Sequence, residues 1–299
     1  MVDAVVKMQK TRLAELLETL AVKEGFSASN LKEVQFIRAS KSHPRAPIIY
    51  EPSIIIVAQG RKRVFLGDQV YNYDPYNYLV LSVPLPFECE TEATPQKPLL
   101  ALSIKVDISM LVELLMEMDD DMKIKGTVRG VYSTELTDQM TSATVRLLEC
   151  LKSPVDSCIL GSQIVREIIY RALCEEQGAA LRAVAARHSR FSQIAKALRL
   201  LHQEYDKEIN VEALAKESNM SVSTFHHNFK AVTSTSPLQY LKNIRLHKAR
   251  ILMVQDGLNA GTAADRVGYL SASQFSREFK RFFGTSPADD AARMRAMAD

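Results

Sequence analysis

The chain has 299 residues, of which 46% are hydrophobic and 24% are charged, and its formal net charge is +3. This composition is typical of proteins that bury ordinary cores, and the length allows two domains. No apolar run approaches the roughly 18–20 residues that cross a bilayer, and the charged N-terminal residues lack the apolar core of a signal peptide. We therefore expect a cytoplasmic protein rather than a membrane or secreted one.

The N-terminal region is expected to open with a helix near Met8–Leu20. Beyond the Pro-containing stretch SHPRAPIIYEP, the pattern changes to short runs rich in Ile, Val, Leu and Tyr, separated by turn signals such as QGRK and DPYN. The predicted strands are Ile54–Gln59, Lys62–Leu66, Gln69–Tyr73, Tyr78–Val83 and Leu99–Val106. Many short strands joined by tight turns are typical of a β-sandwich or barrel.

The hydrophobic period then shifts from 2 toward 3.6, which predicts amphipathic helices over Ser109–Met118, Thr137–Leu151 and Cys158–Glu176. Each helix has an apolar stripe to bury, by default against the chain's own strands and alternatively against a second subunit. The second alternative predicts a homodimer.

The small, basic segment GAALRAVAARHSR (178–190) is interpreted as a linker between an N-terminal domain (1–177) and a C-terminal domain (191–299). Ser189 is expected to cap the next helix, from Arg190 to about Tyr205.

The C-terminal domain contains an internal repeat. SVSTFHHNFKAVTSTSP (221–237) and SASQFSREFKRFFGTSP (271–287) share Ser, Phe, Lys, Thr and Pro residues at a constant offset of fifty positions. In the second copy, Gly268 is placed to end a short helix, since glycine enters the left-handed region freely. Ser271 and Gln274 form a capping box for the following helix. Its phenylalanines fall on one face, at Phe275, Phe279, Phe282 and Phe283.

The first copy follows the same plan. Asn210 and Ser221 are predicted helix caps, and Asn219 takes the place of glycine because asparagine tolerates the left-handed conformation. A helix, a tight turn and a helix with a polar, basic outer face form the arrangement that enters a DNA major groove. The two helix-turn-helix units are predicted at about 211–233 and 262–283.

A long helix from Pro237 to about Val254 is predicted to connect the units. About 18 residues at 1.5 Å each give a rod of roughly 27 Å, close to one turn of B-DNA at about 34–36 Å. The two units can therefore enter successive major grooves, and the alternative is a duplicated helical hairpin used only for packing. Residues 191–299 carry 15 Lys and Arg against 11 Asp and Glu, and no acid lies between Ser218 and Gln255. This balance favours a polyanionic partner such as double-stranded DNA.

The outer faces of the two units supply the candidate DNA contacts. Arg277 is the strongest candidate for a base contact, because its guanidinium can bridge guanine O6 and N7. The other base-contact candidates are Ser223, Thr224, His226, His227, Ser273, Gln274 and Ser276, although each is also an ordinary surface residue. The predicted phosphate contacts are Lys230, Arg245, Lys280 and Arg281.

The motifs LAKESNMSVSTFHHNFKAVTSTSPLQYLKNIRLHKARILM and AADRVGYLSASQFSREFKRFFGTSP resemble the DNA-binding domain of the AraC/XylS family of bacterial transcription regulators. The segment YEPSIIIVAQGRKRVFLGDQVYNYDPYNYLVLSVPLPFE resembles the cupin-like regulatory domain of one AraC subgroup. The resemblance implies a dimeric regulator, more often an activator, that acts on RNA polymerase and responds to a ligand. His227 stands where many relatives have Arg, and Ala263 replaces a larger aliphatic residue.

A cupin-type metal enzyme is the rival hypothesis. The first 187 residues contain a single histidine, His43, and no GxSxG, P-loop or HExxH motif occurs. We therefore expect no catalytic site, no metal and no cofactor. The four cysteines, 89, 150, 158 and 174, have no paired spacing, so we expect reduced, mostly buried thiols, with Cys89 the alternative redox or electrophile sensor.

A barrel without a catalytic set can still bind a small molecule. Its effector is unidentified, and the candidate contacts are Tyr71, Tyr73 and Cys89. The effector is expected to shift the population between arrangements of the DNA-binding domains. A third hypothesis is a constitutive DNA-binding protein whose N-terminal domain only dimerises.

Overall fold

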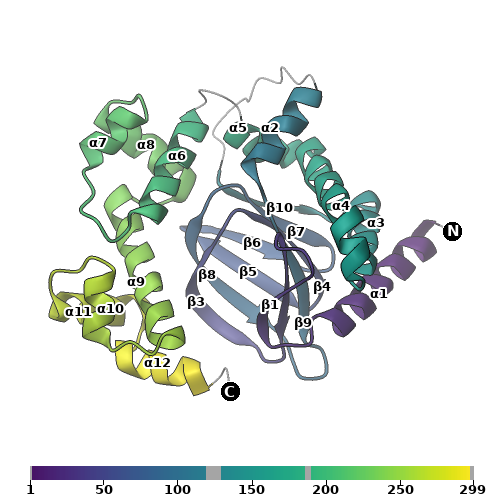
Figure 1. The fold of residues 1–299 in the computed structure, drawn as a ribbon, viewed down its shortest axis with the longest axis horizontal. Helices are drawn as coiled ribbons and strands as arrows, with labels where there is room; N and C mark the ends of the chain where they lie inside the picture. The colour runs from purple at the N-terminus through teal and green to yellow at the C-terminus, as the bar shows by residue number, and fades with distance from the viewer. Residues whose placement is uncertain (1, 119–128, 186–189, 297–299) are drawn as a thin grey trace.

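The fold comes from a computed structural model, which describes residues 2–118, 129–185 and 190–296. A strand-rich N-terminal domain with flanking helices is followed by a domain built from helices (Figure 1). The predicted α+β, two-domain fold class is confirmed. None of the described helices is long and apolar enough to cross a membrane.

Two antiparallel sheets face each other in the N-terminal domain, sheet A in the order β1-β2-β9-β4-β7-β10 and sheet B in the order β3-β8-β5-β6. The strands of sheet A are β1 (Gly25–Ala28), β2 (Val34–Ala39), β9 (Leu99–Lys105), β4 (Ser53–Gln59), β7 (Asn77–Leu81) and β10 (Val131–Glu135). Those of sheet B are β3 (His43–Tyr50), β8 (Leu85–Glu92), β5 (Arg61–Leu66) and β6 (Gln69–Tyr73). The five predicted strands are confirmed as β4, β5, β6, β7 and β9.

The sequence pattern does not predict β1, β2, β3, β8 or β10, and prolines obscure two of these. Pro44 and Pro47 are tolerated in β3 because it is an edge strand of sheet B. β5 pairs only with residues 88–92 of β8, so Pro86 has a paired neighbour in β3 but none in β5. Each proline therefore lies at a position that needs no donor toward a second strand.

Alternating strand residues separate two cores. Val57, Val64 and Leu81 belong to the inner core between the sheets, whereas Ile54 and Ile56 belong to the core on the outer face of sheet A. The helices of the N-terminal domain are α1 (Val2–Leu20), α2 (Ile108–Glu117), α3 (Asp138–Cys150) and α4 (Pro154–Cys174). They contribute to the outer core, so these helices do pack against their own strands, on one side of the sheets (Figure 1).

Most of the predicted linker is a buried helix. Glu176–Gly178 form a short 3-10 helix, and α5 spans Ala179–Ala185. Leu181 lies in the outer core, and Val184 lies in a core that continues from the barrel into the C-terminal helices. The small residues that suggested a linker instead allow close packing where the two domains join. Ser189 lies outside the described residues.

The C-terminal helices confirm the local predictions. They are α6 (Arg190–Gln203), α7 (Val211–Glu217), α8 (Val222–Thr233), α9 (Pro237–Gln255), α10 (Ala260–Arg266), α11 (Ala272–Phe283) and α12 (Pro287–Ala296). Asn210, Ser221 and Ser271 cap α7, α8 and α11 through side-chain oxygens. Asn219 and Gly268 have φ values of 51° and 82°, as the two tight turns require.

The four cysteines divide into two classes. Cys89 and Cys150 are buried, but Cys158 and Cys174 are exposed, and none of the four forms a disulfide. The expectation of mostly buried thiols is therefore wrong for α4, which carries both exposed ones. α4 lies on the outside of the domain, so its outer face meets solvent.

Candidate DNA-binding surface

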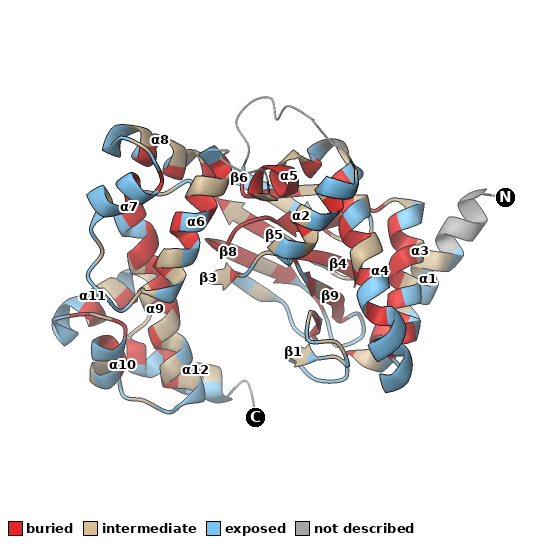
Figure 2. Ribbon diagram, turned by 45° about the horizontal axis from the view of Figure 1, so that its top comes forward, coloured by how far each residue is buried: buried red, intermediate tan, exposed pale blue. Residues whose placement is uncertain are grey.

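The polar faces of α8 and α11 are exposed on the C-terminal domain (Figure 2). Phe225 and Phe229 anchor α8, and Phe275 and Phe279 anchor α11, each with 0% of its surface exposed. The opposite, exposed face presents Ser223, His226, His227 and Lys230 on α8 and Ser273, Gln274, Arg277, Lys280 and Arg281 on α11. Thr224 and Ser276 are half-buried. The aromatic anchors thus fix which residues each helix offers to a partner.

Four of the predicted contacts are cations with no competing partner. Among the described residues, no hydrogen bond or ion pair holds the side chains of Lys230, Arg277, Lys280 or Arg281. Their charges are available to a DNA groove and backbone without the loss of an internal bond. The structure therefore presents cations on both helices, three of them on α11.

Two neutral candidates already have partners. The Gln274 amide donates to Glu278 at 3.1 Å, and the Thr224 hydroxyl accepts from Ser221 at 2.9 Å. Ser271 accepts from the Gln274 backbone N–H, so the Ser half of the predicted capping box is present. For either side chain to contact a base, it must exchange an existing hydrogen bond for a new one.

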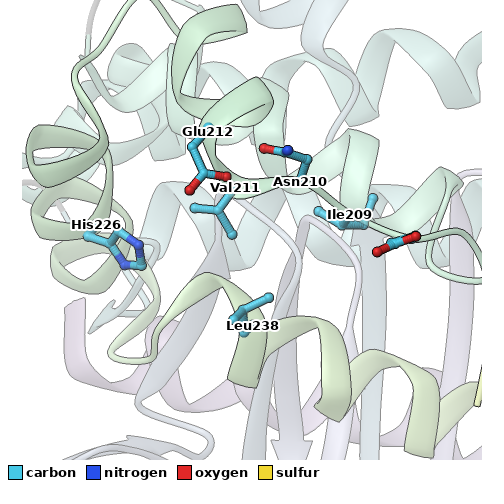
Figure 3. A pocket seen from close by; sticks show the side chains of 7 residues that line it. Ile209, Asn210, Val211, Glu212, His226 and Leu238 are labelled. Atoms are coloured by element: carbon cyan, nitrogen blue, oxygen red, sulfur yellow. The ribbon is translucent and has the colours of Figure 1, made fainter.

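His226 faces a hollow of about 630 Å³ beside α8 (Figure 3). Ile209, Val211 and Leu238 contribute apolar surface to it. The remaining lining residues are Glu208, Asn210 and Glu212. Two carboxylates around this hollow disfavour a phosphate there, so His226 is a weaker candidate for DNA contact than its neighbour His227.

Arg245 lies at a structural junction between the two units. Its guanidinium donates to the carbonyl oxygens of Tyr205 at 2.6 Å, Lys207 at 2.7 Å and Gly268 at 3.0 Å. Burial lowers the pKa of Arg245. The three carbonyls belong to the segment before α7 and to the turn of the second unit, so Arg245 fixes one unit against the other. Because these donors already have partners, Arg245 is a weaker candidate for the predicted phosphate contact than Lys230, Lys280 or Arg281.

The acid-free basic run also has internal partners. Lys242 pairs with Glu278 at 3.1 Å, and Arg250 pairs with Asp290 at 2.6 Å. Lys248 lies over the Tyr205 ring at 5.7 Å. The acids that balance α9 come from α11 and α12, far along the sequence. Much of the positive charge expected to meet DNA therefore attaches the connecting helix to the second unit.

We expect His247 to make the stability of the second unit sensitive to acid. Its ring is buried against Phe282 and Phe283, and Nε2 has no hydrogen-bond partner among the described residues. Burial, and then the charge of Arg250, lower the pKa of His247 to about 3. Its contribution to stability is complete above pH 6.5 and is lost as the pH falls toward 3, because the unfolded chain takes up the proton first.

We expect His247 to contribute about 1.4 kcal/mol per pH unit to the fall in unfolding free energy within that window. Urea unfolding between pH 6.5 and 4.5 measures the slope, and His247→Gln should reduce it. The exposed His227→Gln is the matched control. An unchanged slope in the His247 variant would contradict the assignment.

The first unit closes one end of the barrel. The Tyr240 hydroxyl donates to the Pro84 carbonyl at 2.7 Å and lies 2.8 Å from His202 Nε2. Burial lowers the pKa of His202 to about 4, so its neutral ring donates to the Tyr240 oxygen through Nε2–H. Phe225, Phe229 and Tyr240 belong to the same hydrophobic cluster as the barrel interior. The DNA-binding domain is thus docked on the domain expected to bind the effector.

The effector candidates divide between the interior and its rim. Tyr73 is fully buried, with its hydroxyl 3.6 Å from the Cys89 sulfur. Tyr71 is half-buried and accepts from Arg129 at 3.4 Å. Sequence reasoning missed Lys62, which joins this cluster by donating to the Tyr50 hydroxyl. The signal that could have found it is a lysine at an inward position of a predicted strand. Among the described residues, no group of three or more His, Cys, Asp or Glu could hold a metal ion.

Comparison with known families agrees with this geometry. The family described as AraC-type transcriptional regulator N-terminus matches residues 30–180, and the one described as Helix-turn-helix domain matches residues 214–293. The chain belongs to the AraC family of transcription regulators. Membership in the AraC family makes it a DNA-binding protein of the helix-turn-helix type, in a family of regulators rather than enzymes.

The similar proteins are also regulators. HTH-type transcriptional regulator AlkR of Acinetobacter baylyi is 38% identical over 95 residues, which are 32% of this chain and 31% of AlkR. HTH-type transcriptional activator RhaS of Escherichia coli is 34% identical over 89 residues, 30% of this chain and 32% of RhaS. The match thus spans about a third of these curated relatives.

A solved structure shares the whole fold. ToxT from Vibrio cholerae, with an unsaturated fatty acid bound, has a TM-score of 0.62 at 10% identity, over 89% of this chain and 96% of that chain. At this identity the similarity concerns the arrangement of both domains and no individual residue.

Proposed function

We propose that this AraC-family protein is a sequence-specific transcription activator that acts in the bacterial cytoplasm. Each subunit places α8 and α11 in two successive major grooves of one DNA face, and the bound protein recruits RNA polymerase. The observation that carries the proposal is the pair of exposed, cation-bearing faces joined by one long helix. α9 has 19 residues, which at 1.5 Å each give a length of about 28 Å. The Arg245 contacts make that spacing rigid.

Homodimerisation and effector control complete the proposal. α4 keeps Val155, Ile159 and Leu160 exposed, and apolar residues on an outer helix face favour a second subunit. RhaS is named an activator, and ToxT binds a fatty acid, which support activation and a ligand in the N-terminal domain. The Tyr240–Pro84 contact can couple effector binding to the DNA-binding domain. A ligand that changes the end of the barrel also changes the contact that holds that domain.

Arg277→Ala is expected to lower the affinity for the best DNA sequence about 10–100-fold, because a bidentate contact to guanine contributes about 1–3 kcal/mol. Sequences selected from a random pool supply the DNA, and titration against specific and scrambled duplexes measures both affinities. Weak, salt-dependent binding to the scrambled duplex should survive.

Lys280→Ala is the matched control on the same helix. A phosphate contact contributes to binding of every sequence, so this variant should lower the affinity for both duplexes equally. It should also reduce the slope of log affinity against log salt concentration by about 1. If Arg277→Ala also lowered the affinity for both duplexes equally, Arg277 would be a phosphate contact, and other residues would recognise the DNA sequence. If neither variant changed binding, the proposed surface would be wrong.

A further inference from the structure

A polar cluster lies inside the N-terminal domain, between the two sheets. Strand pairing places Lys62 opposite Tyr73 and Thr91. It also places Val64 opposite Cys89. Directly opposed residues of antiparallel strands share a face, and Val64 belongs to the inner core, so all of these side chains point inward. Lys62 consequently has only 6% of its surface exposed.

The Lys62 side chain is surrounded by hydroxyl and thiol groups. Its Nζ donates to the Tyr50 hydroxyl at 2.8 Å, and the Cys89 sulfur lies nearby, 3.6 Å from the Tyr73 hydroxyl. Burial by itself favours the neutral amine, but attraction to the Tyr50 oxygen and the Cys89 sulfur outweighs it, so the pKa of Lys62 is raised. The side chain therefore carries its charge at neutral pH.

Within residues 2–118, 129–185 and 190–296, no carboxylate balances this charge. Among the described residues, none of the Asp and Glu side chains forms an ion pair with Lys62. Strand alternation explains the absence, because Glu90 and Glu92 of the neighbouring β8 point outward and pair with Arg63. A buried cation without a counter-charge is strongly unfavourable, so an anion that pairs with Lys62 would be stabilised there.

A line of aromatic rings extends from the cluster to the edge of sheet A. Phe26 is paired with Ile37, a residue of the inner core, so its ring also points inward. It is nevertheless 49% exposed, because β1 is the edge strand of sheet A. The rings of Phe26 and Phe87 lie 6.1 Å and 5.2 Å from that of Tyr50. Aromatic surface that leads to a buried cation suits an apolar molecule ending in an anion.

We propose that the N-terminal domain binds a small apolar carboxylic acid. Its carboxylate pairs with the Lys62 ammonium and accepts from the Tyr50 or Tyr73 hydroxyl, while its apolar part lies against Phe26 and Phe87. The acid is the effector of the proposed regulator, and in that respect the inference rests on the proposed function. The binding itself requires no DNA.

Thermal unfolding of the full chain without DNA tests the site. The probes are octanoate and benzoate, with octanamide and benzamide as neutral counterparts at constant ionic strength. We expect the acids to raise Tm by about 2 °C or more at millimolar concentration, because a ligand that binds only the folded state stabilises it, and the amides to leave Tm unchanged.

Lys62→Met keeps the length of the side chain and removes its charge. It should weaken acid binding at least about tenfold in calorimetric titration, since a charge-assisted contact is lost. Lys105→Met, at the exposed end of β9, is the matched control and should bind the acids as the native chain does.

Equal shifts with acids and amides would overturn the proposal, as would undiminished binding by Lys62→Met. The absence of any shift with both acids in the native chain would overturn it too, whether or not the variant folds. DNA titrations of the same samples report separately on the regulator. If the acids bind but leave the DNA affinity unchanged, the proposed binding site stands, and its proposed role in regulation is wrong.

Discussion

Gly268→Ala is expected to lower the free energy of unfolding of the C-terminal domain by about 3 kcal/mol, through backbone strain and an unavoidable clash. Gly268 has a φ of 82°, and a Cβ there would lie 2.2 Å from the Asp206 carbonyl oxygen. That oxygen is backbone and cannot rotate away. The Arg245 guanidinium, 3.1 Å from the same Cβ position, would also be displaced. Urea unfolding measures the loss.

Gly257→Ala separates strain from the clash. Gly257 also has a positive φ, 68°, but nothing lies within 4 Å of its Cβ position. This variant should therefore lose only about 1 kcal/mol, the cost of placing alanine in the left-handed region. A similar loss in both variants would show that the contact between Gly268 and the segment before α7 does not hold the two units together.

Asp290→Ala is expected to lower the free energy of unfolding by about 3–5 kcal/mol, because it leaves a partly buried guanidinium without its counter-charge. Asp290 has 0% of its surface exposed and accepts from Arg250 at 2.6 and 3.2 Å and from Arg293 at 2.9 Å. The Arg250 guanidinium also lies over the Phe283 ring, 4.6 Å from its centroid. The pair thus attaches α12 to the connecting helix, and thermal and urea unfolding measure its loss.

Two variants accompany that measurement. The exposed Asp289→Ala, one position away on the same helix, should lose less than about 1 kcal/mol. The double variant Arg250→Met with Asp290→Leu should recover most of the stability, because an apolar pair carries no desolvation cost. If the single Asp290 variant were as stable as the Asp289 variant, the buried pair would contribute nothing to holding α12.

The repeat made the helix-turn-helix units predictable because their signals are local. A capping side chain such as Ser221 or Ser271 acts within three residues, and a left-handed turn needs Gly268 or a substitute such as Asn219 at one position. The phenylalanine spacing then decides which face is buried. These features identify the exposed faces of the two helices without knowledge of the rest of the chain.

The partners of charged residues were not predictable in this way. Arg245 and Arg250 lie in a run without acids, which favoured DNA, yet their partners are carbonyls and a carboxylate 23 to 40 positions away in sequence. The edge strand β3 was hidden by its prolines for a related reason. Whether a proline is tolerated depends on which neighbour the strand has, and sequence alone does not give the neighbour.

The sequence by itself determined the duplicated DNA-binding units, their spacing helix and the strand-rich character of the N-terminal domain, because periodicity, caps and turns act over a few residues. Only the tertiary structure decided that α5 is buried between the domains, that the first unit closes the barrel and that Lys62 is enclosed without a counter-charge from the described part of the chain. Burial and charge balance are sums over residues distant in the chain, so they exist only once the sheets and helices have come together.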